Sequence, residues 1–387
     1  MKAIKKKSNI LILLLILVNI LPSSSLRLGI VTVIIVSSVM NVFRANNLYK
    51  CIYLRGLNSV VMLFTIYGLW LIIANPFILG MSGNRISNTS YLTTIYLSLL
   101  PIYSFYYYYR KGLLCVKDLR LWLPVLLIAT TYQYYQTQAH LLEIITQRGY
   151  YSDVTNNTGY VFLALIPLGY IFKDKPLIRY GVMLYCMIFI MMSMKRGAIF
   201  IALGCIFLII VENSKNGASL KSVFKNFFIV IAIIGVVYYS FVNILSSNDY
   251  FSSKMASDGG SGRTDIYSVL WSTYLFDFNF LAQIFGKGAN ATILLIGNYA
   301  HNDWLEILIN QGLVGIVVYM IYWKNFIREI LKAKKIMHSY YPLLMLLMIT
   351  LLKSFFSMSY SGMSYIECIA IGVYIAQFEQ KRKFQVS

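Results

Sequence analysis

The chain has 387 residues, of which 58% are hydrophobic and only 12% are charged. This balance excludes an ordinary soluble domain, because so few polar residues cannot cover so large an apolar core. Lys and Arg outnumber Asp and Glu by 34 to 14, which gives a net charge of +20 and raises the possibility of a nucleic-acid partner.

Apolar runs of about 20 residues recur along the whole chain and predict membrane-spanning helices. Only helices satisfy the backbone in the bilayer core at such lengths, so the predicted fold is an all-α polytopic membrane protein. We treat residues 1–387 as a single integral membrane domain. We expect about twelve spans. In chain order they are residues 9–22, 28–43, 57–79, 91–109, 119–137, 158–172, 178–194, 197–211, 226–245, 304–323, 340–358 and 361–377.

Positive charge gathers on one side of these spans. Most of the Lys and Arg residues, from Lys2 to the tail at Lys381–Lys383, fall in segments that share the side of the N-terminus. The positive-inside rule therefore predicts that both termini are cytoplasmic, and it explains the charge without nucleic acid. The first residues resemble a signal peptide, but Pro22–Ser25 has no convincing cleavage motif, so we expect an uncleaved first helix.

Residues 246–303 form the largest hydrophilic insertion and are predicted to be a large extracytoplasmic loop. Reactive groups are often carried by loops on a packed scaffold, so this segment is the expected place for chemistry. Within it, Phe278–Ile284 and Ala291–Ile296 are apolar but too short to span a bilayer. We expect these two runs to lie along the membrane surface or to re-enter it.

A polar cluster at His301, Asn302 and Asp303 opens directly into an apolar helix. A histidine at a helix start on the outer face can accept a proton near neutral pH, and the helix dipole helps to keep it neutral. Asn302 or Asp303 could cap the helix. Glu306 could orient the imidazole ring or lie on another helix face.

Two sites of positive charge on the outer side could hold an anion. Lys195 and Arg196 stand at the turn between the seventh and eighth spans; the alternative is that the span boundaries are shifted and this is an ordinary cytoplasmic flank. Arg263 follows the glycine-rich residues 259–262, and its guanidinium fork suits phosphate oxygens. The alternative for Arg263 is an ion pair with Asp265.

Lys353 and Glu367 are charged residues inside the last two spans. Charges in a bilayer are costly unless they are paired or line a polar cavity. We expect the two side chains to face each other; alternatively, Lys353 points into the site as a further phosphate contact.

The sequence shows no nucleotide-binding motif, and the five cysteines show neither a metal-ligand spacing nor an extracytoplasmic disulfide. An enzyme of this kind would need a substrate that is already activated. We therefore expect no metal and no cofactor in the reaction.

Several motifs together resemble a known family. They are Gly286–Ala289, His301–Leu308 and Gly312–Gly315, preceded by two basic motifs at Lys195–Ala198 and Ser261–Arg263. In order, spacing and shared outward side the set resembles the signature of the O-antigen polymerase and O-antigen ligase superfamily. The resemblance extends over essentially the whole chain.

The resemblance implies a fold like that of the GT-C glycosyltransferases, in the bacterial inner (cytoplasmic) membrane, with the active site on the periplasmic face. It implies His301 as the general base, and Lys195, Arg196 and Arg263 as contacts to a lipid diphosphate. Asn302, Asp303, Glu306 and Lys353 are possible supporting residues. Many relatives have an acidic residue just before the Gly-Leu-x-Gly element, where this chain has Asn310-Gln311. Any role that the family assigns to this acidic residue is therefore open here.

From this resemblance we expect a metal-independent glycosyltransferase that polymerises repeat units of O-antigen, capsule or exopolysaccharide. Its substrates would be undecaprenyl-diphosphate-linked oligosaccharides, and its partners would be the lipid bilayer, a chain-length regulator and a flippase. The alternatives are an O-antigen ligase, which transfers the glycan to lipid A-core, and a flippase for the same lipid-linked oligosaccharide. No nucleic-acid partner is expected.

Overall fold

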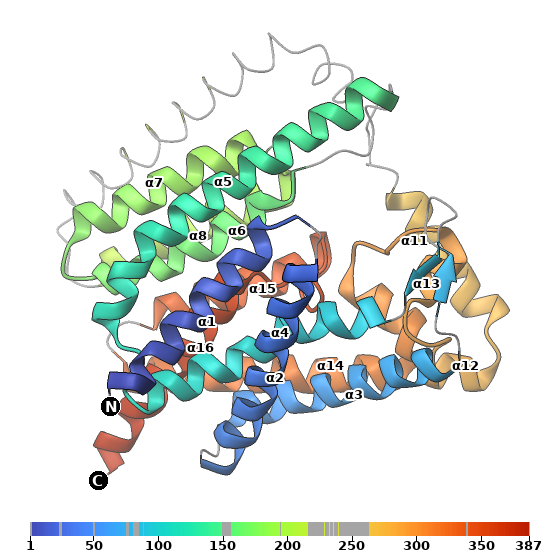
Figure 1. Cartoon of the computed structure of the whole chain (residues 1–387), viewed down its shortest axis with the longest axis horizontal. Coiled ribbons are helices and arrows are strands. Elements are labelled where there is room, and N and C mark those ends of the chain that lie inside the picture. Colours follow the sequence, from blue (N-terminus) through green and yellow to red (C-terminus); the bar gives the residue numbers. More distant parts are fainter. Residues whose placement is uncertain are drawn as a thin grey trace. The chain divides into compact units, whose positions relative to one another are not determined.

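The computed structural model describes residues 2–22, 25–48, 51–74, 77–79, 85–87, 89–148, 156–193, 195–215, 263–337 and 340–386, with residues 228, 232, 235 and 239 as isolated positions. These residues are almost all helical (Figure 1). Up to the middle of the chain the helices are α1 (Lys2–Ile20), α2 (Ser25–Leu48), α3 (Ile52–Ala74), α4 (Thr89–Arg110), α5 (Val116–Arg148), α6 (Thr158–Leu168), the 3-10 helix η1 (Gly169–Phe172), α7 (Pro176–Met192) and α8 (Arg196–Lys215).

The later helices include several short ones. They are α11 (Arg263–Ser272), the π-helix η2 (Thr273–Asp277), α12 (Phe280–Phe285), α13 (Ala291–Ile296), α14 (Asp303–Ile336), α15 (Tyr341–Phe356) and α16 (Tyr365–Val386). One small antiparallel sheet joins β1 (Phe77–Leu79) to β2 (Arg85–Ser87), with Phe77 opposite Ser87. The described chain is therefore helical apart from this hairpin, which the sequence did not predict.

The predicted spans agree with these helices. Each of them overlaps a helix except residues 226–245, which lie almost entirely outside the described residues. The end of the predicted span 57–79 is instead strand β1. Among the described residues, 4 helices are long and apolar enough to cross a membrane: Ser25–Asn46, Ile52–Ile73, Arg196–Lys215 and Asp303–Ile336. The full count of about twelve spans stays a prediction.

The chain forms two compact units. Unit 1 comprises Met1–Leu113, Gly262–Met337 and Thr350–Ser387, and unit 2 comprises Leu114–Ser261 and His338–Ile349. The organisation as one integral membrane domain stays a prediction.

In unit 1, α14 packs along α3, while α4 packs against α2 and α16. Aromatic side chains fill the contact between α3 and α14: the rings of Tyr53 and Phe326 lie 4.7 Å apart, and both are fully buried. The Tyr53 hydroxyl lies 3.3 Å from that of Tyr322, so its polar end is satisfied inside the core. At the end of α14 that begins with Asp303, the helices α11, α12 and α13 pack against it (Figure 1).

In unit 2, α6 packs against α5, α7 and α8. The buried Glu212 of α8 accepts a hydrogen bond of 2.6 Å from the Tyr170 hydroxyl and lies 3.9 Å from the Arg179 guanidinium. Its charge is thus balanced locally, as a carboxylate in an apolar helix bundle requires.

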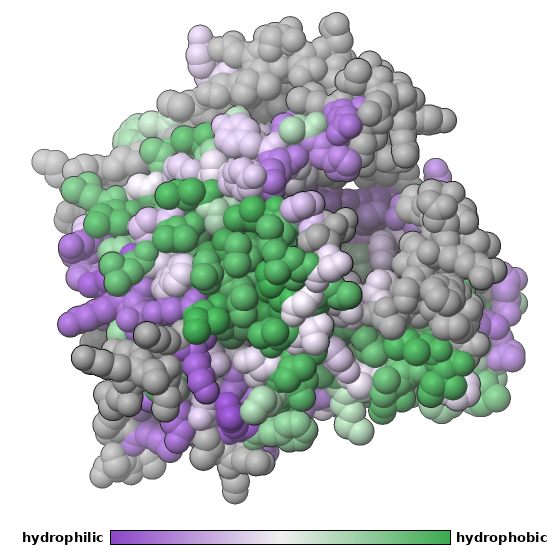
Figure 2. All heavy atoms as spheres, viewed as in Figure 1, coloured by the Kyte–Doolittle hydropathy of each residue, from purple (hydrophilic) through white to green (hydrophobic). Residues whose placement is uncertain are grey.

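Large apolar side chains point outward from unit 1. Figure 2 shows hydrophobic side chains gathered over α1 and again over the end of α3 and the neighbouring α12. On α12, Phe280, Leu281 and Phe285 are 74%, 64% and 52% exposed. Contiguous outward apolar surface of this kind is typical of helices that face lipid.

The described part of the predicted large loop is folded. Residues 246–262 lie outside the described residues, but residues 263–302 form α11, η2, α12 and α13. The two short apolar runs correspond to α12 and α13. Their place at the membrane surface stays a prediction.

Candidate functional site

The helix that follows His301 is broken at Gly312. This residue has φ 66° and ψ −159°, although helical residues flank it on both sides in α14. A Cβ on Gly312 would lie 2.4 Å from the carbonyl oxygen of Ile284, and one on Gly286 (φ +74°) would lie 2.3 Å from that of Asn310. Only glycine permits both the positive φ and this approach of two backbones.

The break frees carbonyl groups that a neighbouring loop then binds. In an unbroken helix the carbonyls of Ile309 and Asn310 would accept from amides four residues later. Here they accept from the amides of Lys287 and Gly288, at 3.0 and 2.9 Å. The loop between α12 and α13 therefore replaces the bonds that α14 lacks, which is what an apolar environment demands of a broken helix.

Glu306 fixes the chain just before His301. Its buried carboxylate accepts hydrogen bonds from the Ala300 amide at 2.7 Å, from the Asn310 side chain at 3.0 Å and from the Thr292 hydroxyl. Asn310 in turn accepts from the Thr292 amide at 3.1 Å. Glu306 thus holds α13 on α14 and sets the backbone next to His301, so it acts on the histidine through Ala300.

His301 adopts a left-handed backbone conformation with φ 54°. Its side chain is half-buried. Directly after it, Asn302 caps α14, with its side-chain oxygen accepting from the amides of Trp304 and Leu305 at 2.9 and 3.1 Å. A non-glycine residue with positive φ is uncommon and often marks a functional position. His301 is therefore presented from a backbone that is held on both sides.

Asp303 is fully buried and has a structural role. Its carboxylate accepts from the amides of Ser359 and Tyr360, at 2.9 and 3.2 Å, and from the Tyr319 hydroxyl at 2.7 Å. It thereby ties the loop between α15 and α16 to the start of α14. Of the two predicted capping residues, Asn302 caps the helix.

Tyr360 contributes its backbone amide to this contact, and its ring stacks on Phe64 with 4.6 Å between centroids. Burial raises the pKa of the Tyr360 phenol well above its ordinary value. The phenol therefore stays protonated at physiological pH and adds no charge near Asp303.

An aromatic groove of about 350 Å³ lies beside the capped end of α14. Tyr267, Trp271 and Tyr274 line it from α11 and η2, and Trp304 and Leu308 line it from α14. Asn302, which directly follows His301 in the chain, is also part of the groove wall.

Arg263 is the first residue of α11, and its Nη1 donates to the Phe356 carbonyl at 2.8 Å, at the end of α15. The alternative of an ion pair with Asp265 is not found within the described residues. A guanidinium carries five N–H donors, so this bond orients Arg263 and leaves donors for an anion.

Lys195 and Arg196 lie at the turn between α7 and α8 in unit 2, and the side chain of Arg196 is exposed. The predicted turn is confirmed. The convergence of these two cations with His301 stays a prediction.

Lys353 and Glu367 form the expected pair. The Lys353 ammonium lies 3.0 Å from the Glu367 carboxylate and donates to the Gly362 carbonyl at 2.6 Å, and both side chains are buried. This geometry favours the structural alternative over a phosphate contact for Lys353.

Sequence reasoning missed Thr292 and Tyr319, which bind the carboxylates of Glu306 and Asp303. It also missed Gln311, whose side chain donates to the Tyr91 hydroxyl of α4 at 3.2 Å. Thr292 and Tyr91 come from other segments, and Tyr319 lies across the break at Gly312. The one sequence signal was the polar pair Asn310-Gln311 inside an apolar span.

Comparison with known families identifies this region. Residues 181–320 match the family model described as O-Antigen ligase. The match covers a little over a third of the chain and contains Lys195, Arg196, Arg263 and His301. A comparison with curated proteins found no match. The similarity over residues 181–320 supports the predicted relation to the O-antigen ligase and polymerase superfamily, whose members are glycosyltransferase-like enzymes.

Proposed function

We propose that the chain is a repeat-unit polymerase for O-antigen, capsule or exopolysaccharide. It would act at the outer face of the bacterial inner membrane, on oligosaccharides linked to undecaprenyl diphosphate. The family match supports this proposal. So does the observation that carries it: His301 stands in a left-handed conformation between Glu306-bound Ala300 and the cap at Asn302.

In the proposed reaction, a sugar hydroxyl of the acceptor attacks the anomeric carbon of the donor sugar. The new C–O bond forms as the bond to the diphosphate breaks, and the diphosphate leaves with the electron pair. The imidazole of His301 takes the hydroxyl proton. Arg263, with Lys195 and Arg196, would stabilise the charge that develops on the leaving diphosphate. No step needs a metal ion or a cofactor.

The aromatic groove supports a lipid-linked substrate. Its walls are mostly apolar, and they include Asn302, which directly follows His301 in the chain. An isoprenoid chain fits such walls because transfer of its apolar surface out of water is favourable. The diphosphate would then lie near Asn302, close to the proposed base.

The decisive experiment measures glycan elongation by the purified chain supplied with lipid-linked repeat units. His301→Ala is expected to lower the elongation rate by about 10²–10⁴-fold, the usual contribution of a general base. His140→Ala is the matched control, because that histidine is exposed on α5. Full elongation by the His301→Ala protein would remove the proposed base.

A ligase is the second candidate, since the matched family model is described as O-Antigen ligase. The products of a deletion strain separate the two activities. Loss of a polymerase leaves single repeat units attached to the acceptor, whereas loss of a ligase leaves long unattached chains on the carrier lipid.

A flippase is the third candidate. Elongation by the purified chain without any other enzyme would exclude a pure transporter.

A further inference from the structure

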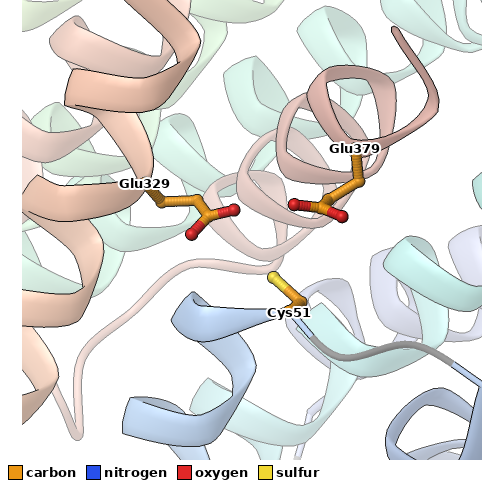
Figure 3. A group of neighbouring side chains, drawn as sticks. All are labelled: Cys51, Glu329 and Glu379. Carbon is orange, nitrogen blue, oxygen red and sulfur yellow. The ribbon is translucent and has the colours of Figure 1, made fainter. Parts of the chain in front are cut away.

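Three buried acidic groups converge far from the candidate site (Figure 3). Cys51 directly precedes α3, Glu329 lies in the last part of α14, and Glu379 lies on α16. Their ligand atoms are all within 4.8 Å of one another. Figure 3 shows the two carboxylates pointing toward each other, with the thiol beside them.

The Glu329 carboxylate is buried without a partner that satisfies it. The side chain is 0% exposed, and neither of its oxygens has a hydrogen-bond donor within the described part of the chain. Glu379 accepts from the Arg382 guanidinium at 2.9 Å, so one of the two charges is balanced. Two facing carboxylates in a buried position repel each other unless a proton or a cation lies between them.

The cluster is a separate place in the molecule from the site around His301. Glu329 lies 17 residues beyond the break at Gly312 on α14, and at a rise of about 1.5 Å per residue this is roughly 25 Å of continuous helix. That length is close to the thickness of the hydrocarbon core of a bilayer, about 30 Å. The positive-inside pattern predicts that the segments carrying Cys51, Glu329 and Glu379 all face the cytoplasm.

We propose that Cys51, Glu329 and Glu379 bind one divalent transition-metal ion of the zinc class. Carboxylate oxygens and a cysteine thiolate are zinc ligands, and the soft thiolate disfavours magnesium and calcium. The thiol proton is released to solvent when the ion binds. The two charges of the ion and the charge of Arg382 then balance the three anionic ligands.

The geometry requires only a small closure. Zinc holds oxygen ligands at about 2.0–2.2 Å and sulfur at about 2.3 Å, so the ligand atoms around it lie about 3.5 Å apart. Side-chain rotations would close the present separations, of up to 4.8 Å, to that spacing. A fourth, tetrahedral position remains for water. Because the ion joins the beginning of α3 to α14 and α16, it acts as a structural staple and takes no part in glycosyl transfer.

The test uses the full-length chain, purified without a histidine tag, loaded with Zn²⁺ and washed free of excess ion. Elemental analysis is expected to find one zinc per chain in the wild type. Cys51→Ser and Glu329→Gln are each expected to lower the retained zinc at least about tenfold, because each removes a ligand. Cys186→Ser is the matched control, since Cys186 is an equally buried cysteine on α7 with no place in the cluster, and it should retain the ion.

Co²⁺ gives a second readout, which tests for a bound thiolate in the wild type itself. Bound to the wild type, it should show a thiolate-to-cobalt charge-transfer band, which Cys51→Ser abolishes and Cys186→Ser keeps. Zn²⁺ should also raise the thermal midpoint of the wild type and leave that of the Cys51→Ser protein unchanged. Absence of retained zinc and of the cobalt band in the wild type would overturn the proposal, as would equal retention in all variants. A proton shared by Glu329 and Glu379 would then balance the charge.

Discussion

Buried carboxylates near the two ends of α14 differ in the number of hydrogen bonds that they accept. At the beginning of the helix, Asp303 and Glu306 accept hydrogen bonds from several donors each. Near its end, Glu329 is equally buried but has no donor within the described residues. A satisfied carboxylate organises backbone around a site, whereas an unsatisfied one requires a proton or an ion.

The largest effect is expected at the break in the first part of α14, where the backbone of Gly312 lies against that of Ile284 and Gly286. Gly312→Ala places a Cβ 2.4 Å from a carbonyl oxygen and strains a positive φ. We expect the protein to lose about 3 kcal/mol or more of stability, measured as the thermal midpoint of the solubilised chain.

Gly288→Ala is the matched control for this change. Gly288 has φ +102°, but a Cβ added there would meet no heavy atom within 4 Å beyond its chain neighbours. The substitution should cost only the backbone strain, about 1–2 kcal/mol. An equal loss in the two variants would show that the contact between the two backbones adds nothing.

Asp303→Ala removes the acceptor of two amides and one hydroxyl. The amides of Ser359 and Tyr360 and the hydroxyl of Tyr319 would be left buried without a partner. Since each such group costs about 1–3 kcal/mol, we expect a loss of about 3 kcal/mol. Hydrogen exchange should rise in the loop between α15 and α16, and unchanged exchange there would contradict this role for Asp303.

Glu306→Gln keeps the volume of the side chain but replaces one acceptor oxygen with a donor. One donor among Ala300, Thr292 and Asn310 then loses its partner, which should cost about 2 kcal/mol. Because Ala300 precedes His301, the elongation rate should fall while the pH dependence set by His301 remains. Glu143→Gln is the control, since Glu143 is exposed on α5. A Glu306→Gln protein with wild-type rate and stability would show that the hydrogen bond from the Ala300 amide to Glu306 is not needed to position His301.

Glu329→Gln makes the same substitution at the other end of the same helix, and its effect should have the opposite sign. In protein stripped of metal, replacement of a buried carboxyl that accepts no hydrogen bond should leave stability unchanged or raise it by about 1 kcal/mol. Comparison of its thermal midpoint with that of Glu306→Gln sharpens the contrast. A clear loss of stability in metal-free Glu329→Gln would mean that this carboxylate already has a partner.

The sequence predicted those features that depend on local pattern. Apolar runs located the helices, and a cap at Asn302 or Asp303 followed from their position before an apolar helix. The pairing of Lys353 with Glu367 followed from the cost of charge in a bilayer. These features need only neighbours along the chain or a matching depth in the membrane.

The features that the sequence did not predict depend on contacts between distant segments. Gly286 and Gly312 stood out as motif residues, yet nothing in the pattern showed that their backbones touch. Arg263 was expected to bind phosphate or Asp265, but its guanidinium also reaches the end of α15. The cluster of Cys51, Glu329 and Glu379 has no ligand spacing, because its members come from three remote parts of the chain.

The exchange of backbone hydrogen bonds at the break in α14 limits how the protein can admit a substrate. If the segment of α12 and α13 swung away, the carbonyls of Ile309 and Asn310 would be left bare in an apolar setting. The segment of α12 and α13 therefore does not act as a gate for substrate entry. The proposed lipid-linked substrate would then enter the aromatic groove past exposed rings such as that of Trp271, without movement of α12 and α13.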